Sequence, residues 1–203
     1  MRTQIVIIGA GPAGLLLGCL LDKQGIDNII LERQSADYVL ARIRAGILEQ
    51  TTVDLMHRLG AGSRLNAEGI IHHGVNIAFD KQMQAIPLGA STCGKVVTAY
   101  GQTELTKDLF DVRMAGHSQT IYQAEEVCPH DFDTDSPSVT FRHQGAEHRI
   151  ECDIIVGCDG YHGVSRASVP EAAIRTYEKI YPFAYFFDFY CFSGIFLYLF
   201  PKS

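Results

Sequence analysis

Three glycines near the N-terminus have the spacing of a dinucleotide-binding loop. Gly9, Gly11 and Gly14 form a GxGxxG pattern directly after the apolar run 4–9, the context in which this pattern is meaningful. The first glycine permits a tight turn, the second lets the backbone approach a pyrophosphate, and the third lets helix and strand pack closely. The phosphates would lie at the positive end of a helix that begins near Pro12. A tight turn without a ligand is the alternative.

Two carboxylates indicate which dinucleotide the loop would hold. Glu32 follows a second apolar run, where a carboxylate accepts hydrogen bonds from ribose hydroxyls and repels a 2′-phosphate, which favours FAD or NAD over NADP. Asp159 and Gly160 follow a further apolar run and resemble a second dinucleotide element, which a simple NAD dehydrogenase does not need. Together the two acids favour FAD, although either alone could be an exposed strand end or a turn residue.

The elements expected around these residues alternate as in an α/β protein. Strands over 4–9, 28–32 and 153–157 should pair in a parallel sheet, with a right-handed crossover through a helix over 15–23. Further helices are expected over 42–59 and 103–114, and further strands over 70–71, 75–79, 83–88, 120–127, 138–142 and 148–152. We predict an α/β, Rossmann-like fold with an insertion of antiparallel strands at about 69–100.

The composition is that of an ordinary globular protein. Of the 203 residues, 47% are hydrophobic and 20% charged. The net charge of −6 argues against broad electrostatic binding to nucleic acid or to an anionic membrane. The six cysteines form no CxxC pair, and the short apolar start does not resemble a signal peptide, so we predict a cytoplasmic protein with reduced thiols.

Other residue groups have ordinary structural interpretations. His72 and His73 have no carboxylate or cysteine at ligand spacing, so we predict a pair on a strand surface and no metal site. Cys158 could be a redox thiol beside Asp159, but a small buried residue at a strand end is favoured. No Ser-His-Asp arrangement supports hydrolysis.

Several further motifs carry a resemblance to a known family. They are Glu32–Gln34, Tyr38, Arg42–Gly46, Tyr100–Glu104 and Asp159–Arg166, together with the glycine pattern. From residue 1 to about 182 the chain resembles the 4-hydroxybenzoate 3-monooxygenases, single-component FAD-dependent aromatic hydroxylases. The resemblance implies an FAD-binding domain over 1–182 that is truncated before the substrate-binding sheet of the family.

The resemblance also implies ligands and the residues that bind them. NADPH would reduce FAD, and dioxygen would supply the hydroxyl group that converts 4-hydroxybenzoate to 3,4-dihydroxybenzoate. A homodimer is one possible state of the full-length form. No catalytic residue is assigned within this chain. The residues implied to hold FAD are Gly9, Gly11, Ala13, Gly14, Glu32, Arg42, Ile43, Arg44, Ala45, Gly46, Ile47, Gln102 and Asp159, with Arg44 at the pyrophosphate. The residues implied to contact NADPH are Arg33, Gln34, Tyr38, His162 and Arg166.

The last residues of the chain are anomalous. Ten of the twenty Phe and Tyr residues lie in 183–203, with the period of neither a strand nor a helix. A membrane anchor, a buried hairpin and a tail read out of frame or across a splice boundary are the three interpretations. We favour the last, because the family resemblance ends where this segment begins. The segment is therefore predicted not to be native domain sequence.

Three alternatives to an intact hydroxylase of this kind stay open. The 203-residue chain would be inactive by itself if it is truncated, and a non-catalytic FAD- or nucleotide-binding fragment is the main alternative. A different flavin-dependent aromatic hydroxylase, such as one of the salicylate type, is the second, although Arg33, Gln34 and Tyr38 argue against it. A membrane-tethered protein is the third.

Overall fold

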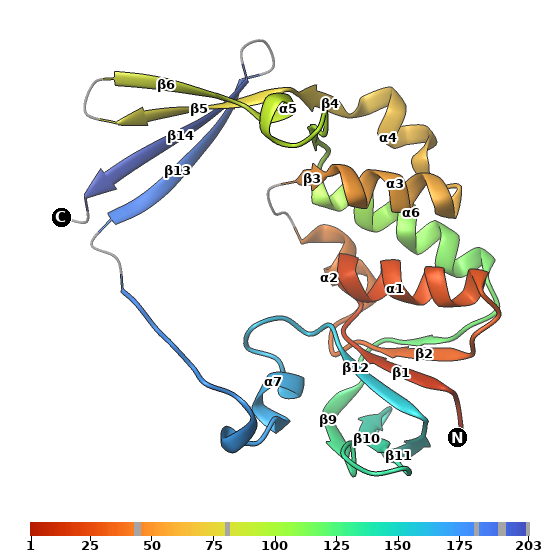
Figure 1. Ribbon diagram of the computed structural model, residues 1–203. Helices are drawn as coiled ribbons and strands as arrows, with labels where there is room; N and C mark the ends of the chain where they lie inside the picture. The colour runs from red at the N-terminus through yellow and green to blue at the C-terminus, as the bar shows by residue number, and fades with distance from the viewer. Residues whose placement is uncertain (43–45, 80–81, 181–182, 191–193, 202–203) are drawn as a thin grey trace. The chain divides into compact units, whose positions relative to one another are not determined.

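Two compact units make up the chain in the computed structural model (Figure 1), which describes residues 1–42, 46–79, 82–180, 183–190 and 194–201. The first unit comprises residues 1–44 and 102–175, and the second comprises 45–101 and 176–203. Each unit has sheets of its own.

A four-stranded parallel sheet forms the centre of the first unit, in the order β12-β1-β2-β8. Its strands are β1 (Ile5–Ile8), β2 (Asn28–Leu31), β8 (Thr120–Ile121) and β12 (Ile154–Gly157). Val6, Ile7 and Ile30 are fully buried, as expected for strands covered on both faces. The predicted parallel pairing of the three apolar runs is confirmed.

Helices cover one face of this sheet (Figure 1). They are α1 (Pro12–Lys23), α2 (Ala36–Ala41) and α6 (Gln102–Ala115). Leu15 of α1 and Leu109 of α6 are fully buried. At Gly18, an added Cβ would lie 2.8 Å from Cδ1 of Ile30. The small residue therefore allows α1 to lie close against β2.

A three-stranded antiparallel sheet covers the other face (Figure 1). Its strands are β9 (Glu125–His130), β10 (Ser138–His143) and β11 (Ala146–Glu151), in the order β11-β10-β9. Val6 and Leu31 of the parallel sheet share one hydrophobic core with Phe141 and Ile150 of the antiparallel sheet. The first unit thus has three layers, and the short helices α7 (Val164–Ser168) and η1 (Glu171–Ala173) follow β12.

The second unit contains two further sheets. One has the order β3-β7-β4, and the other has the order β13-β14-β5-β6. Their strands are β3 (Ile47–Glu49), β4 (Ile70–His72), β5 (Gly74–Phe79), β6 (Gln82–Pro87), β7 (Val97–Ala99), β13 (Phe183–Tyr190) and β14 (Gly194–Pro201). The helices are α3 (Gln50–Leu59), α4 (Gly62–Glu68) and α5 (Leu88–Ser91). The antiparallel pairing predicted within 69–100 is confirmed by the β4–β7 and β5–β6 ladders.

Two predicted elements differ from the structure. The helix expected over 42–59 is wrong in its first part, because β3 occupies Ile47–Glu49 and only α3 is helical. Pairing of β3 with β7 overrides the local helical preference of that stretch. The strand expected over 120–127 is two strands, β8 and β9, separated where Gln123 adopts a left-handed φ of 56°.

The aromatic-rich segment forms a hairpin in the second unit. β13 pairs with β14 in antiparallel register, and β14 pairs with β5 in parallel register. The pairing agrees with one part of the buried-hairpin interpretation, while the prediction that 183–203 is not native domain sequence stays a prediction. Among the described residues, no helix is both long enough and apolar enough to cross a membrane.

A buried ion pair, which no sequence pattern indicated, joins the helices to the start of the parallel strands. The side chain of Arg113 in α6 is only 2% exposed, and its guanidinium lies 2.7 Å from the Asp22 carboxylate in α1. Arg113 also donates to the Asn28 side chain at 2.8 Å, to the Gln119 carbonyl at 2.8 Å and to the Thr120 hydroxyl at 3.2 Å. These contacts tie α1 and α6 to the beginnings of β2 and β8.

Replacing this arginine should destabilise the fold strongly. Arg113→Met leaves the Asp22 carboxylate without its buried cation, so we expect the free energy of unfolding to fall by about 3–5 kcal/mol. Arg142→Met is the matched control, because Arg142 is half exposed and lies 3.9 Å from Glu126, a pair expected to contribute less than about 1 kcal/mol. Urea denaturation measures the free energy of unfolding of both variants. Equal losses of stability would contradict the stabilising role of the Arg113–Asp22 pair.

Candidate functional site

The glycine loop is shaped by close contacts at the end of β1. Gly9 has a φ of +105°, and an added Cβ would lie 2.6 Å from the carbonyl oxygen of Cys158. An added Cβ on Gly14 would overlap the carbonyl oxygen of Gly9. Both positions therefore require glycine, one for its backbone conformation and the other for the approach of α1 to the loop.

The beginning of α1 is open in front of Gly11. Gly11 is the N-cap residue, and its carbonyl accepts the N–H of Leu15 at 3.0 Å. Apart from the residues next to Gly11 in the chain, no described residue has an atom within 4 Å of an added Cβ. Within the described residues, no side chain caps this helix, and its first turn holds no acid. Amides of a first helical turn lack partners inside the helix, so Ala13 and Gly14 offer their N–H groups, and the helix dipole its positive end, to an anion.

The Glu32 carboxylate lies beside this loop. One oxygen accepts the backbone N–H of Ala10 at 2.8 Å, and the other accepts the backbone N–H of Gln34 at 2.8 Å. An ionised carboxylate has about four acceptor positions, so each oxygen keeps capacity for one hydroxyl donor. The two backbone donors were not foreseen from the sequence, because only the fold brings the loop after β1 next to the end of β2.

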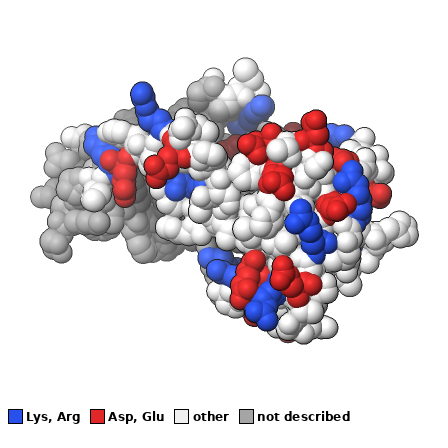
Figure 2. Space-filling view, turned by 90° about the horizontal axis from the view of Figure 1, so that it is seen from below, with Lys and Arg blue, Asp and Glu red and all other residues white. Residues whose placement is uncertain are grey.

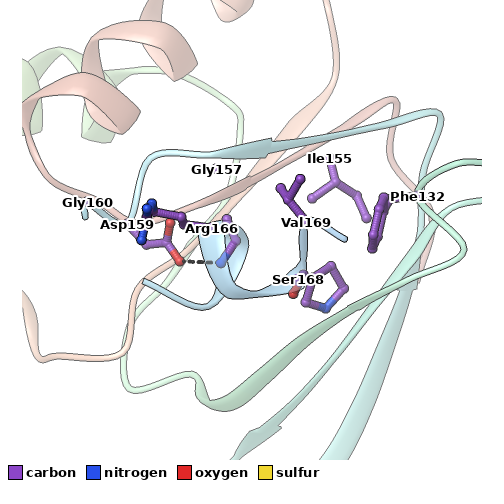
Figure 3. A pocket seen from close by; sticks show the side chains of 10 residues that line it. Phe132, Ile155, Gly157, Asp159, Gly160, Arg166, Ser168 and Val169 are labelled. Atoms are coloured by element: carbon purple, nitrogen blue, oxygen red, sulfur yellow. Dashed lines mark hydrogen bonds between the residues drawn. The ribbon is translucent and has the colours of Figure 1, made fainter. Parts of the chain in front are cut away.

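Asp159 lies at the same edge of the sheet, after β12. The N–H of Cys158 donates to the Ile8 carbonyl at 2.7 Å, which holds this turn beside the glycine loop. The Asp159 carboxylate accepts the backbone N–H of Ser165 at 3.0 Å at the start of α7 (Figure 3), and an added Cβ on Gly163 would overlap that carboxylate. Asp159 therefore fixes α7, a structural role that its sequence context did not indicate.

A cavity of about 520 Å³ lies next to Asp159. Phe132, Ile155 and Val169 form an apolar part of its wall, and Arg166 and Asp159 lie at a polar part (Figure 3). The cavity is thus bounded by β12, by α7 and by the turn after β9.

Residues implied to contact NADPH form two groups within the first unit. Arg33 and Gln34 follow β2, and Tyr38 is 51% exposed in α2, where its N–H donates to the hydroxyl of the Ser35 cap at 3.2 Å.

The second group lies around α7. The Arg166 guanidinium lies 4.2 Å from the centre of the Tyr161 ring, and His162 meets the same ring edge to face at 5.0 Å. The structure thus brings His162 and Arg166 together around Tyr161, an exposed aromatic residue of the same motif that was not predicted to contact NADPH.

The remaining predicted FAD residues are placed as follows. Arg42 is exposed at the end of α2, and Gln102 begins α6, where its carbonyl accepts the Thr106 hydroxyl at 2.7 Å. In the second unit, the Gly46 carbonyl accepts the N–H of Tyr100 at 2.9 Å and Ile47 begins β3. Ile43, Arg44 and Ala45 lie outside the described residues.

The thiol beside Asp159, predicted to be a small buried residue, is only partly buried in the structure. Burial, followed by the negative charge of Asp159, raises the pKa of Cys158, so this thiol is neutral at physiological pH and poorly nucleophilic. Across the part of the chain that the structure describes, no group of three or more His, Cys, Asp or Glu side chains could hold a metal ion. On the face shown in Figure 2, acidic and basic side chains are interspersed.

Two curated proteins show what this sequence is similar to. The chain is 52% identical over 185 residues to the p-hydroxybenzoate hydroxylase of Acinetobacter baylyi, a match that covers 91% of this chain and 46% of that protein. It is 27% identical over 176 residues to the 3-amino-4-hydroxybenzoate 2-monooxygenase of Streptomyces cremeus, covering 85% of this chain and 43% of that protein. The chain thus spans less than half the length of either relative.

Solved structures and a family profile agree with these relatives. The crystal structure of p-nitrophenol 4-monooxygenase from Pseudomonas putida superimposes with a TM-score of 0.68 at 15% identity, covering 92% of this chain and 45% of that one, which shows the same fold. The profile of the FAD binding domain family matches residues 2–188. The chain belongs to this family of FAD-binding domains.

Proposed function

We propose that these residues are the FAD-binding part of an NADPH-dependent monooxygenase that hydroxylates 4-hydroxybenzoate to 3,4-dihydroxybenzoate with dioxygen. The observation that carries the proposal is the open start of α1 in front of Gly11, with the Glu32 carboxylate held beside it by the N–H of Ala10. The identity of 52% to p-hydroxybenzoate hydroxylase supports the substrate. FAD, when bound, supplies the redox chemistry with dioxygen that amino acid side chains lack.

Each residue at this edge has a separate task in the proposal. The N–H groups of Ala13 and Gly14 bind the pyrophosphate, which approaches where Gly11 leaves space. The remaining acceptor positions of Glu32 take hydrogen bonds from the ribose hydroxyls. Asp159 orients the turn after β12 and closes the site on the opposite side of β1 from Glu32.

In the proposed enzyme, these residues and the part present only in the longer relatives have different tasks. Because the chain spans 46% of the length of p-hydroxybenzoate hydroxylase, we assign cofactor binding to these residues and hydroxylation to the whole protein. We expect no product from the 203 residues alone. A homodimer of the whole protein belongs to the same proposal. We also propose a cytoplasmic location, because free thiols, as in the described cysteines, are typical of a reducing compartment.

A second candidate function is another FAD-dependent aromatic hydroxylase. It is supported by the similarity to 3-amino-4-hydroxybenzoate 2-monooxygenase, at 27% identity over a comparable length. The greater identity to p-hydroxybenzoate hydroxylase favours the first proposal. A non-catalytic FAD-binding fragment would share the cofactor site and differ only in turnover.

Reversing the charge at Glu32 should weaken FAD binding. Glu32→Arg removes the ribose acceptor, and a hydrogen bond to a charged group contributes about 1.5–3 kcal/mol, so we expect the Kd for FAD to rise by at least about tenfold. The Kd of the wild-type and variant proteins is measured by titration with FAD, with quenching of the flavin fluorescence as the signal. Glu147→Arg is the matched control, because Glu147 is exposed in β11. Folded wild-type chain that binds no FAD would refute the cofactor assignment.

The segment after β2 should select the nicotinamide nucleotide. In the whole enzyme, Arg33 would form a charge-assisted contact with the 2′-phosphate of NADPH. Arg33→Glu should therefore lower the ratio of kcat/KM for NADPH to kcat/KM for NADH by at least about tenfold. A tenfold change corresponds to a free-energy difference of about 1.4 kcal/mol. Arg142→Glu, an exposed change in β10, should leave the ratio unchanged. An unmutated enzyme that uses both nucleotides equally would show that the segment has another role.

A further inference from the structure

We propose that Tyr122 is a further binding residue of the FAD site, whose phenol hydroxyl donates to the ribose hydroxyls that Glu32 accepts from. The inference rests on the proposed function, because it concerns the same cofactor. It goes beyond that function because it assigns a residue that neither the motifs nor the family resemblance identified.

The register of the parallel sheet places Tyr122 next to Glu32. Strands β2 and β8 pair Ile30 with Thr120 and Leu31 with Ile121. The next residues along the two strands are Glu32 and Tyr122. The N–H of Glu32 donates to the Ile121 carbonyl at 2.9 Å. The backbone pairing therefore continues past the ends of the two strands and places Glu32 beside Tyr122.

Both side chains lie on the helix-covered face of the sheet. Thr120, two residues before Tyr122, contacts Arg113 of α6, and side chains two residues apart along a strand share a face. The Tyr122 ring lies 6.3 Å from the ring of Phe110 in α6, centre to centre. Ile30, two residues before Glu32, lies close to Gly18 of α1 on that same face.

The backbone after Tyr122 is held in an uncommon conformation against the segment after β2. Gln123 has a left-handed φ of 56°, and its N–H donates to the Gln34 carbonyl at 3.1 Å. The N–H of Ala124 donates to the Glu32 carbonyl at 2.9 Å. Non-glycine residues in this region of φ are uncommon and concentrate at functional sites. The two turns are thus fastened together with Tyr122 and Glu32 side by side.

The chemistry of the two groups is complementary. An ionised carboxylate only accepts hydrogen bonds, whereas a ribose hydroxyl both donates and accepts. Burial, followed by the charge of Glu32, raises the pKa of Tyr122 to about 12, which keeps the phenol protonated at physiological pH. Glu32 can therefore accept from the ribose while Tyr122 donates to it.

The test is Tyr122→Phe, which keeps the ring and removes the hydroxyl. We expect the Kd for FAD and the inhibition constant of ADP, a competitor with the same adenosine end, to rise together by about fivefold, the effect of one neutral hydrogen bond. In a Glu32→Gln background the same substitution should change the Kd by less than about twofold, because the two groups share one ribose. Tyr177→Phe is the control, since Tyr177 is 84% exposed, and the melting temperature without FAD should not change.

Each other outcome has a definite meaning. If the wild-type chain binds FAD and Tyr122→Phe binds it equally well, the inference is overturned while the proposed function stands. Equal effects with and without Glu32, or a lower melting temperature of the FAD-free variant, indicate a structural role and also overturn it. A folded wild-type chain that binds neither FAD nor ADP refutes the proposed function itself.

Discussion

The close approach of two turns and the start of a helix at the end of β1 is the constraint on which the first unit depends. Gly9 leaves no space for a side chain against Cys158, and Gly14 leaves none against Gly9. These contacts bring the turns after β1 and β12 and the start of α1 to one edge of the sheet. The proposed cofactor site is therefore a consequence of backbone packing, which positions the polar groups of Glu32 and Asp159.

The opposite edge of the same sheet is fixed by charge. Arg113 and Asp22 form a buried pair that joins α1 and α6 to the beginnings of β2 and β8. Separating the two partners would leave an uncompensated buried charge, so packings that move α1 away from α6 are disfavoured. With both edges fixed, α1 has little freedom to shift along β2, and its N-terminus stays in front of the glycine loop.

The sequence predicted the parts of the fold that depend on local patterns. Continuous apolar runs identified β1, β2 and β12, and GxGxxG identified the loop. Elements whose state depends on distant partners were missed. Ile47–Glu49 is a strand because β7 lies beside it, and the break at Gln123 depends on contacts with Gln34. The contacts of Arg113 and the proposed role of Tyr122 could not be predicted for the same reason, since their partners come from separate elements.

The two acids of the site illustrate how structural and binding roles combine. Glu32 is held by two backbone N–H groups, and Asp159 is held by one at the start of α7. A carboxylate that already accepts from the backbone has fewer rotamers to lose when a ligand arrives, so less entropy opposes binding. The same hydrogen bonds that end the strands thus prepare their carboxylates as acceptors. In the proposed site, the two acids that would bind the dinucleotide are therefore also residues that close turns of this fold.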